Sequence, residues 1–148
     1  MKKRLIGVCA ASAVLAPVLT LVGTGPAFAA DSGVSWRNES NGKYLAYFNY
    51  RVRTTSAIGP TSKWFENKQS DGTYTMRHDI DRKCLDSNSR GDVYIGACNG
   101  GDYQKWYEIQ DSSGWRLKDK ATGRVLEVGI DGQVHTEADA GAPRQRWS

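Results

Sequence analysis

The side chains best suited to chemistry lie between residues 86 and 104. Asp86 and Asn99 supply a carboxylate and an amide, and Tyr94 supplies an aromatic ring with a hydroxyl at its tip. An ionised carboxylate accepts two hydrogen bonds, whereas an amide both donates and accepts. Together with a flat aromatic face, these groups match a ligand that carries neighbouring hydroxyls and an apolar ring face, as a sugar does.

Each of these segments also has a purely structural interpretation. Asp86-Ser87-Asn88 could be a turn whose side chains bond to their own backbone. Asn99-Gly100-Gly101 could be an ordinary loop. The choice therefore depends on the elements that hold these residues.

A tripeptide that ends in Trp occurs three times at even spacing. Gln-Lys-Trp at 104–106 is followed by Gln-Arg-Trp at 145–147, and Ser-Lys-Trp at 62–64 precedes both. The Trp positions differ by 106−64 = 42 and 147−106 = 41 residues. Evenly spaced similar units are typical of a repeat architecture, here with units at about 33-66, 73-108 and 114-148.

The third unit aligns with the second without a gap, so that Leu126 falls on Leu85 and Gln145 on Gln104. Leu45 takes the same place in the first unit, which is two residues shorter between its Leu and its Trp. Three symmetric indoles fit one shared core better than three separate sites. We therefore predict that the three repeated Trp residues are buried: Trp64, Trp106 and Trp147.

Short β-type runs separated by turn residues fill each unit. The runs 74–77, 92–95 and 115–118 are examples, and no window of helical length has a clean period near 3.6. Short hairpins must close their sheet edges, and a barrel-like arrangement does so. The sequence thus predicts an all-β fold in which the three units share one core.

The first 29 residues predict a secretory signal peptide. Lys2-Lys3-Arg4 is a positive start, residues 5–22 are largely apolar, and Ala27-Phe28-Ala29 is a typical cleavage signal. A membrane anchor is the alternative, but the polar run 23–26 ends the apolar segment. We expect one secreted, extracellular domain over residues 30–148, with no membrane association after cleavage.

Charge and cysteine content fit such a domain. The mature chain carries 17 basic and 16 acidic residues, because three of the 20 basic residues lie in the signal peptide. Its net charge of +1 argues against nucleic acid as a partner.

Cys84 and Cys98 remain after cleavage and predict one disulfide, with two buried free thiols as the alternative. His78 and His135 lie far apart, and we expect neither a metal nor a cofactor.

The three units resemble the ricin-type β-trefoil lectin domain over essentially the whole mature chain. The second unit is the most specific, because residues 84–88, 91, 93–94, 98–101 and 103–106 closely resemble a repeat of the actinohivin-like lectins of actinomycetes. The resemblance implies a β-trefoil of about twelve short strands with pseudo-threefold symmetry. It also implies up to three shallow pockets for high-mannose glycans, one in each unit.

By position, the resemblance implies a sugar site in the second unit. Asp86 would accept hydrogen bonds from sugar hydroxyls, Tyr94 would line the pocket, and Asn99 would add a polar contact. Gln104 would support the pocket and the core, and Tyr103 would border it.

Departures from this pattern limit what the resemblance implies. Gly96 stands where the similar lectins carry a Leu that walls the pocket, so a preference for a linked mannose pair does not follow. In the third unit Glu127, His135 and Ala140 replace the site residues. Either the site is lost there, or Glu127 and His135 form a different pocket.

In the first unit Ala46 replaces the carboxylate. The aromatic residues of that unit are either strand and core residues or an aromatic contact patch: Tyr44, Tyr47, Phe48 and Tyr50.

We therefore expect a non-catalytic, monomeric lectin that binds glycans or glycoproteins, of the mannose type, through one site. The alternative is a β-trefoil that binds or inhibits a protein, for which an aromatic patch near Tyr47 and Tyr50 would serve. A glycosidase would need two opposed carboxylates in a cleft. The acidic residues near His78, namely Asp79 and Asp81, are instead expected to lie with it on a solvated turn.

Overall fold

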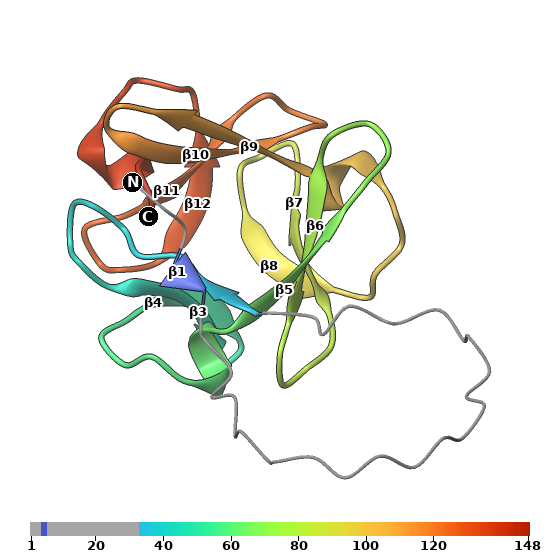
Figure 1. The fold of residues 1–148 in the computed structure, drawn as a ribbon, viewed down its shortest axis with the longest axis horizontal. Helices are drawn as coiled ribbons and strands as arrows, with labels where there is room; N and C mark the ends of the chain where they lie inside the picture. Colours follow the sequence, from blue (N-terminus) through green and yellow to red (C-terminus); the bar gives the residue numbers. More distant parts are fainter. Residues whose placement is uncertain (1–3, 6–32) are drawn as a thin grey trace, which may run out of the picture.

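The fold consists of short β-strands joined by tight turns (Figure 1). The computed structural model describes residues 4–5 and 33–148, so the predicted signal peptide lies almost entirely outside the described residues. Among the described residues there are three short 3-10 helices and no α-helix, and no helix has the length and apolar character needed to span a bilayer. The strands are β1 (Arg4–Leu5), β2 (Val34–Ser35), β3 (Tyr44–Phe48), β4 (Arg51–Thr55), β5 (Trp64–Lys68), β6 (Tyr74–His78), β7 (Cys84–Ser87), β8 (Val93–Gly96), β9 (Trp106–Asp111), β10 (Gly114–Asp119), β11 (Val125–Val128) and β12 (Val134–Glu137).

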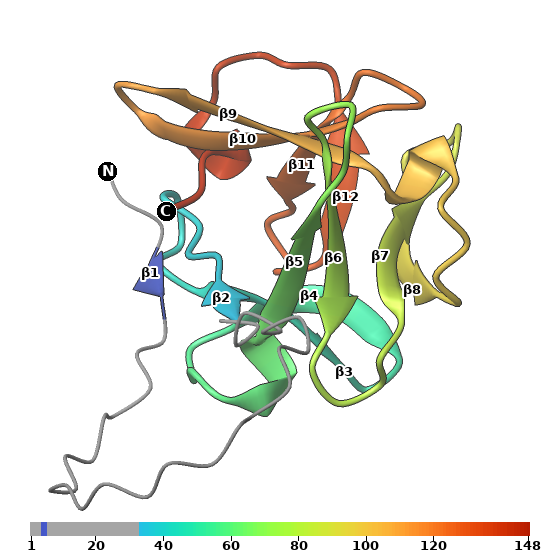
Figure 2. The ribbon, with the colours of Figure 1, turned by 45° about the vertical axis from the view of Figure 1, so that its right-hand side comes forward.

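The strands form three equivalent hairpins on a closed ring. Strands β3–β4, β7–β8 and β11–β12 are the hairpins, one from each unit, whereas β5–β6 and β9–β10 pair across the boundaries between units (Figure 2). Arg37 and Ser148 close the ring by exchanging both backbone hydrogen bonds, each 2.8 Å long. The predicted all-β trefoil is confirmed.

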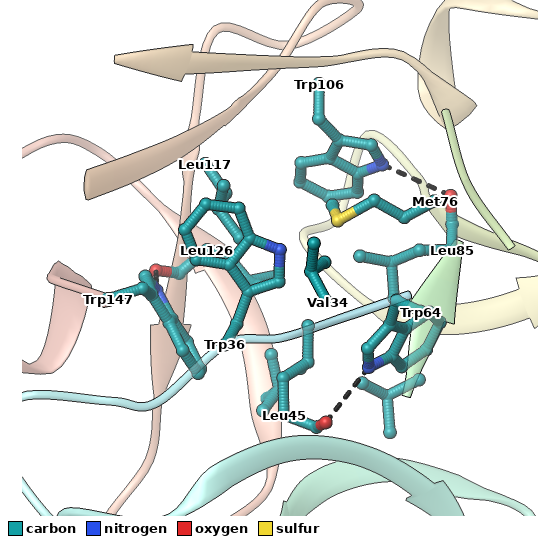
Figure 3. Packing of buried hydrophobic residues seen from close by; sticks show 12 residues of the cluster. Val34, Trp36, Leu45, Trp64, Met76, Leu85, Trp106, Leu117, Leu126 and Trp147 are labelled. Carbon is teal, nitrogen blue, oxygen red and sulfur yellow. Dashed lines mark hydrogen bonds between the residues drawn. The ribbon is translucent and has the colours of Figure 1, made fainter. Parts of the chain in front are cut away.

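The core has the symmetry that the spacing predicted. Each repeated Trp is fully buried, and its indole N–H donates to the carbonyl of the Leu in its own unit. The three bonds are Trp64 to Leu45 at 2.9 Å, Trp106 to Leu85 at 3.2 Å and Trp147 to Leu126 at 3.1 Å. Figure 3 shows the apolar side chains of all three units converging on one centre. A buried indole is favourable only when its N–H has a partner, and this repeated bond supplies it.

Two of the three hairpin turns are held by the backbone of the next unit. The Gly91 carbonyl accepts from the Thr136 N–H at 2.9 Å, and the Gly132 carbonyl accepts from the Thr54 N–H at 2.8 Å. Gly91 has φ +95°, and a Cβ there would lie only 2.7 Å from the Thr136 carbonyl oxygen. Glycine is therefore required where the β7–β8 hairpin contacts the third unit.

The expectation that His78 lies on a solvated turn is wrong. Its side chain is fully buried, its Nε2 donates to the Thr61 carbonyl at 3.0 Å, and its Nδ1 lies 2.8 Å from Asp81 Oδ2. The ring also packs against Trp64, with centroids 5.0 Å apart. Because both ring nitrogens have partners, His78 can be buried as a structural link between the first and second units.

A charged cluster joins the second and third units at the surface. Lys120 Nζ lies 2.9 Å from Asp71 Oδ2 and 3.0 Å from Asp102 Oδ1. Hydrogen bonds from Thr73 and Lys120 lower the pKa of Asp71, and bonding to Lys120 lowers the pKa of Asp102.

These lowered pKa values make the cluster sensitive to acid. A carboxylate with a lowered pKa stabilises the fold above its unfolded pKa, about 3.9 for Asp, and this contribution is lost as the pH falls towards the folded value. We expect the urea midpoint to decrease as the pH falls below about 4, and to decrease less in Lys120→Met, because that variant lacks the nearer of the two cations, Lys120 and Lys105, that face both carboxylates. Lys118→Met is the control. An unchanged pH dependence in Lys120→Met would show that the cluster does not contribute.

Candidate functional site

Two hairpin strands and a disulfide position the candidate site of the second unit. Asp86 on β7 and Tyr94 on β8 are direct cross-strand partners. The predicted disulfide between Cys84 and Cys98 is present, and it ties the start of β7 to the loop that follows β8. The closed loop has a sequence separation of 14 residues. In the chain-entropy model such a loop contributes about 3 kcal/mol of stability.

Gln104 forms hydrogen bonds with both the Asp86 carboxylate and the loop that follows β8. It lies buried at the end of the second 3-10 helix, Asp102–Gln104. Its Nε2 donates to Asp86 Oδ2 at 2.8 Å and to the Ala97 carbonyl at 2.9 Å, and its Oε1 accepts from the Asn99 N–H at 2.9 Å. One amide thus uses both of its donors and an acceptor to fix Asp86, as a supporting residue does.

The second carboxylate oxygen of Asp86 has no hydrogen-bond partner among the described residues. Asp86 keeps 8% of its surface exposed, and its Oδ1 accepts no hydrogen bond from any residue of 33–148. Space beside the carboxylate depends on Gly96, because a Cβ there would lie 3.0 Å from Asp86 Oδ2. The arrangement therefore leaves one oxygen of a fixed carboxylate without a protein partner.

Tyr94 forms one wall of the site as a neutral phenol. Its hydroxyl donates to the Ser87 carbonyl at 3.1 Å, and its ring is partly exposed. Burial, and then the nearby Asp86 carboxylate, raise the pKa of Tyr94. The hydroxyl therefore stays protonated at neutral pH.

The polar segments 86–88 and 99–101 form some of the local turn bonds that a purely structural interpretation predicts. Asn88 Oδ1 accepts from the backbone N–H groups of Arg90 and Asp92, so Asn88 is a turn residue. Asn99 Oδ1 accepts from the Gly101 N–H at 2.8 Å, but no residue of the described domain accepts from its Nδ2. Asn99 keeps donors for a ligand, and Tyr103 is exposed on the adjacent 3-10 helix.

The third unit repeats the same hydrogen-bond pattern. Gln145 Nε2 donates to Glu127 Oε2 at 2.7 Å and to the Ala138 carbonyl at 2.8 Å, and its Oε1 accepts from the Ala140 N–H at 2.9 Å. The replacement of Asp by Glu therefore does not break the scaffold of the pocket.

The second oxygen of Glu127 distinguishes this unit. Glu127 Oε1 lies 3.5 Å from His135 Nε2 and 3.5 Å from Arg144 Nη2, whereas the corresponding oxygen of Asp86 is open. Sequence reasoning missed Arg144, although it occupies the position of Tyr103 at the offset of 41 residues. In the first unit Ala46 is buried and offers no carboxylate.

Most of the aromatic residues of the first unit are strand or core residues, as the first interpretation predicts. Tyr44, Tyr47 and Phe48 lie in β3, and Tyr47 packs against the core. Tyr50 lies in the turn that follows and is 94% exposed.

Several solved structures share this fold. A designed threefold-symmetric protein, ThreeFoil, has a TM-score of 0.71 at 23% identity, over 76% of this chain and 94% of that one. SeviL, solved with the asialo-GM1 saccharide, has a TM-score of 0.66 at 18% identity, over 76% and 91%. An endo-β-galactosidase from Clostridium perfringens has a TM-score of 0.70 at 15% identity, over 77% of this chain but only 31% of the enzyme. At these identities the likeness concerns the fold alone.

Comparison by sequence identifies the family. No curated protein matches the chain. The ricin-type beta-trefoil lectin domain matches residues 35–147, which include all three units and the whole of the hydrogen-bond pattern described above. The chain therefore belongs to the ricin-type β-trefoil lectin domain family.

Proposed function

We propose that this protein is a secreted, non-catalytic lectin that binds mannose-type glycans through one site, in its second unit. Family membership supports carbohydrate binding in general. The choice of the second unit rests on one observation. Asp86 has an oxygen open to a ligand, whereas the corresponding oxygen of Glu127 faces His135 and Arg144.

The proposed site contacts a sugar in three ways. Asp86 Oδ1 accepts from ring hydroxyls in charge-assisted bonds, and Asn99 Nδ2 donates to a neighbouring hydroxyl. The Tyr94 ring packs against the apolar face of the sugar. In the third unit a sugar hydroxyl would have to compete with the His135 and Arg144 side chains for Glu127, which disfavours binding there.

A glycan array followed by calorimetric titration with methyl α-mannoside tests this proposal. We expect selective binding of mannose-rich glycans and one mannoside per chain, with a dissociation constant of about 0.1–1 mM. Binding of two or three mannosides per chain would overturn the single-site assignment. A folded protein that binds no glycan would favour the protein-binding alternative, with Tyr50 on the contact surface.

A further inference from the structure

The turn between β3 and β4 holds an aromatic residue in a conformation that favours glycine. Asn49 and Tyr50 have φ values of +51° and +59°, and Phe48 pairs with Arg51 on either side of them. Two-residue turns of this kind prefer Asn-Gly, and a bulky side chain at the second position is strained. Because Tyr50 is almost fully exposed, packing does not offset the strain. Strain of this kind is characteristic of functional positions.

A groove lies beside this turn, where all three units meet. Its volume is about 500 Å³, within the range of ligand pockets. Tyr50 comes from the first unit, Tyr94 and Asp92 from the second, and Gln133 from the third. Tyr94 lines the groove and is also the cross-strand partner of Asp86, so one side chain borders both the groove and the proposed site.

The polar groups of the groove are fixed in place. Asp92 Oδ2 accepts from Asn88 Nδ2 at 2.8 Å and from Arg90 Nε at 3.1 Å, and these bonds lower the pKa of Asp92, so that it is ionised at neutral pH. Arg51 Nη1 donates to Gln133 Oε1 at 3.0 Å, which joins the strained turn to the third unit. A groove lined by an ionised carboxylate and two aromatic side chains offers a sugar the same kinds of contact as the Asp86 site.

We propose that this groove is an extension subsite, in which Tyr50 packs against a further ring of a linear oligosaccharide whose first ring occupies the Asp86 site. The inference rests on the proposed function and deepens it, because it makes an oligosaccharide of two or three linked sugars the preferred ligand. Tyr94 then contacts both rings, and Asp92 accepts from hydroxyls of the second.

Substitution of Tyr50 in the β3–β4 turn gives the variant that tests the subsite. Tyr50→Gly creates the preferred Asn-Gly pair, so removing the ring should also relieve the strain. We expect its Tm to rise by about 3–6 °C. Tyr50→Phe keeps the ring, and Ile130→Ser removes an equally exposed apolar side chain that does not line the groove.

Titration of each variant with methyl α-mannoside and with a linear α-mannotriose tests the subsite. The wild type should bind the trisaccharide about tenfold more tightly than the monosaccharide, a factor that one aromatic contact can supply. Tyr50→Gly should lose that factor with its monosaccharide affinity unchanged, whereas Tyr50→Phe and Ile130→Ser should keep it.

Failure of the subsite is distinguishable from failure of the lectin proposal. Equal wild-type affinity for the two sugars, or undiminished trisaccharide binding by Tyr50→Gly, would overturn the subsite and leave the Asp86 site standing. A wild type that binds neither sugar would overturn both proposals.

Discussion

Asp86→Asn should weaken mannoside binding by about 10- to 100-fold while the fold stays intact. Hydrogen bonds to a charged group are worth about 1.5–3 kcal/mol, and the substitution removes the charge from the one oxygen that faces a ligand. The new amide oxygen can still accept from Gln104 Nε2, which is 2.8 Å from Asp86 Oδ2. Calorimetric titration measures the loss of affinity, and thermal unfolding verifies the fold.

The third unit supplies a matched control. Glu127→Gln removes the corresponding carboxylate, which makes the corresponding bond to Gln145 at 2.7 Å. It should leave mannoside binding unchanged. If Glu127→Gln abolished binding and Asp86→Asn did not, the functional site would lie in the third unit, and His135 and Arg144 would contact the sugar.

Trp106→Ala should bring the domain close to unfolding. Truncating a buried Trp costs about 3–5 kcal/mol, and loss of the N–H that pairs with the Leu85 carbonyl adds about 1–3 kcal/mol. The total is comparable to the 5–15 kcal/mol that stabilises a typical domain. Urea unfolding followed by near-UV circular dichroism should give a midpoint near zero denaturant.

The repeat allows a test of this explanation with milder variants. Trp106→Phe and Trp147→Phe remove the same bond in equivalent environments, so their costs should agree within about 1 kcal/mol. Trp64→Phe should cost more, because the Trp64 indole also packs against the buried His78 ring. A negligible cost for Trp106→Phe would show that the indole bond contributes little.

The features that repeat along the chain could be predicted from the sequence. Trp64, Trp106 and Trp147 recur at fixed spacing with a Leu in each unit, and one shared core is the simplest way to bury them. The disulfide followed from the number of cysteines after the predicted signal peptide. The role of Asp86 as a sugar ligand stays a prediction.

The features that depend on contacts between units could not be predicted. His78 was expected on a solvated turn because local turn signals do not show the Thr61 carbonyl, 17 residues away, that pairs with it. Arg144 facing Glu127 depends on the third 3-10 helix folding back over β11. Asn49-Tyr50 gives no turn signal, since glycine is the usual second residue there.

The closure of the ring at Arg37 and Ser148 also bears on how the protein is made. Arg37, which lies between β2 and β3, obtains its backbone partner from Ser148, so the barrel cannot close until residue 148 has left the ribosome. Contacts this distant in sequence form late and slowly. A chain cut before Arg146 should therefore fail to close the barrel, because Arg37, Glu39 and Trp115 would lose their backbone partners, and we expect such a product to be degraded rather than partly active.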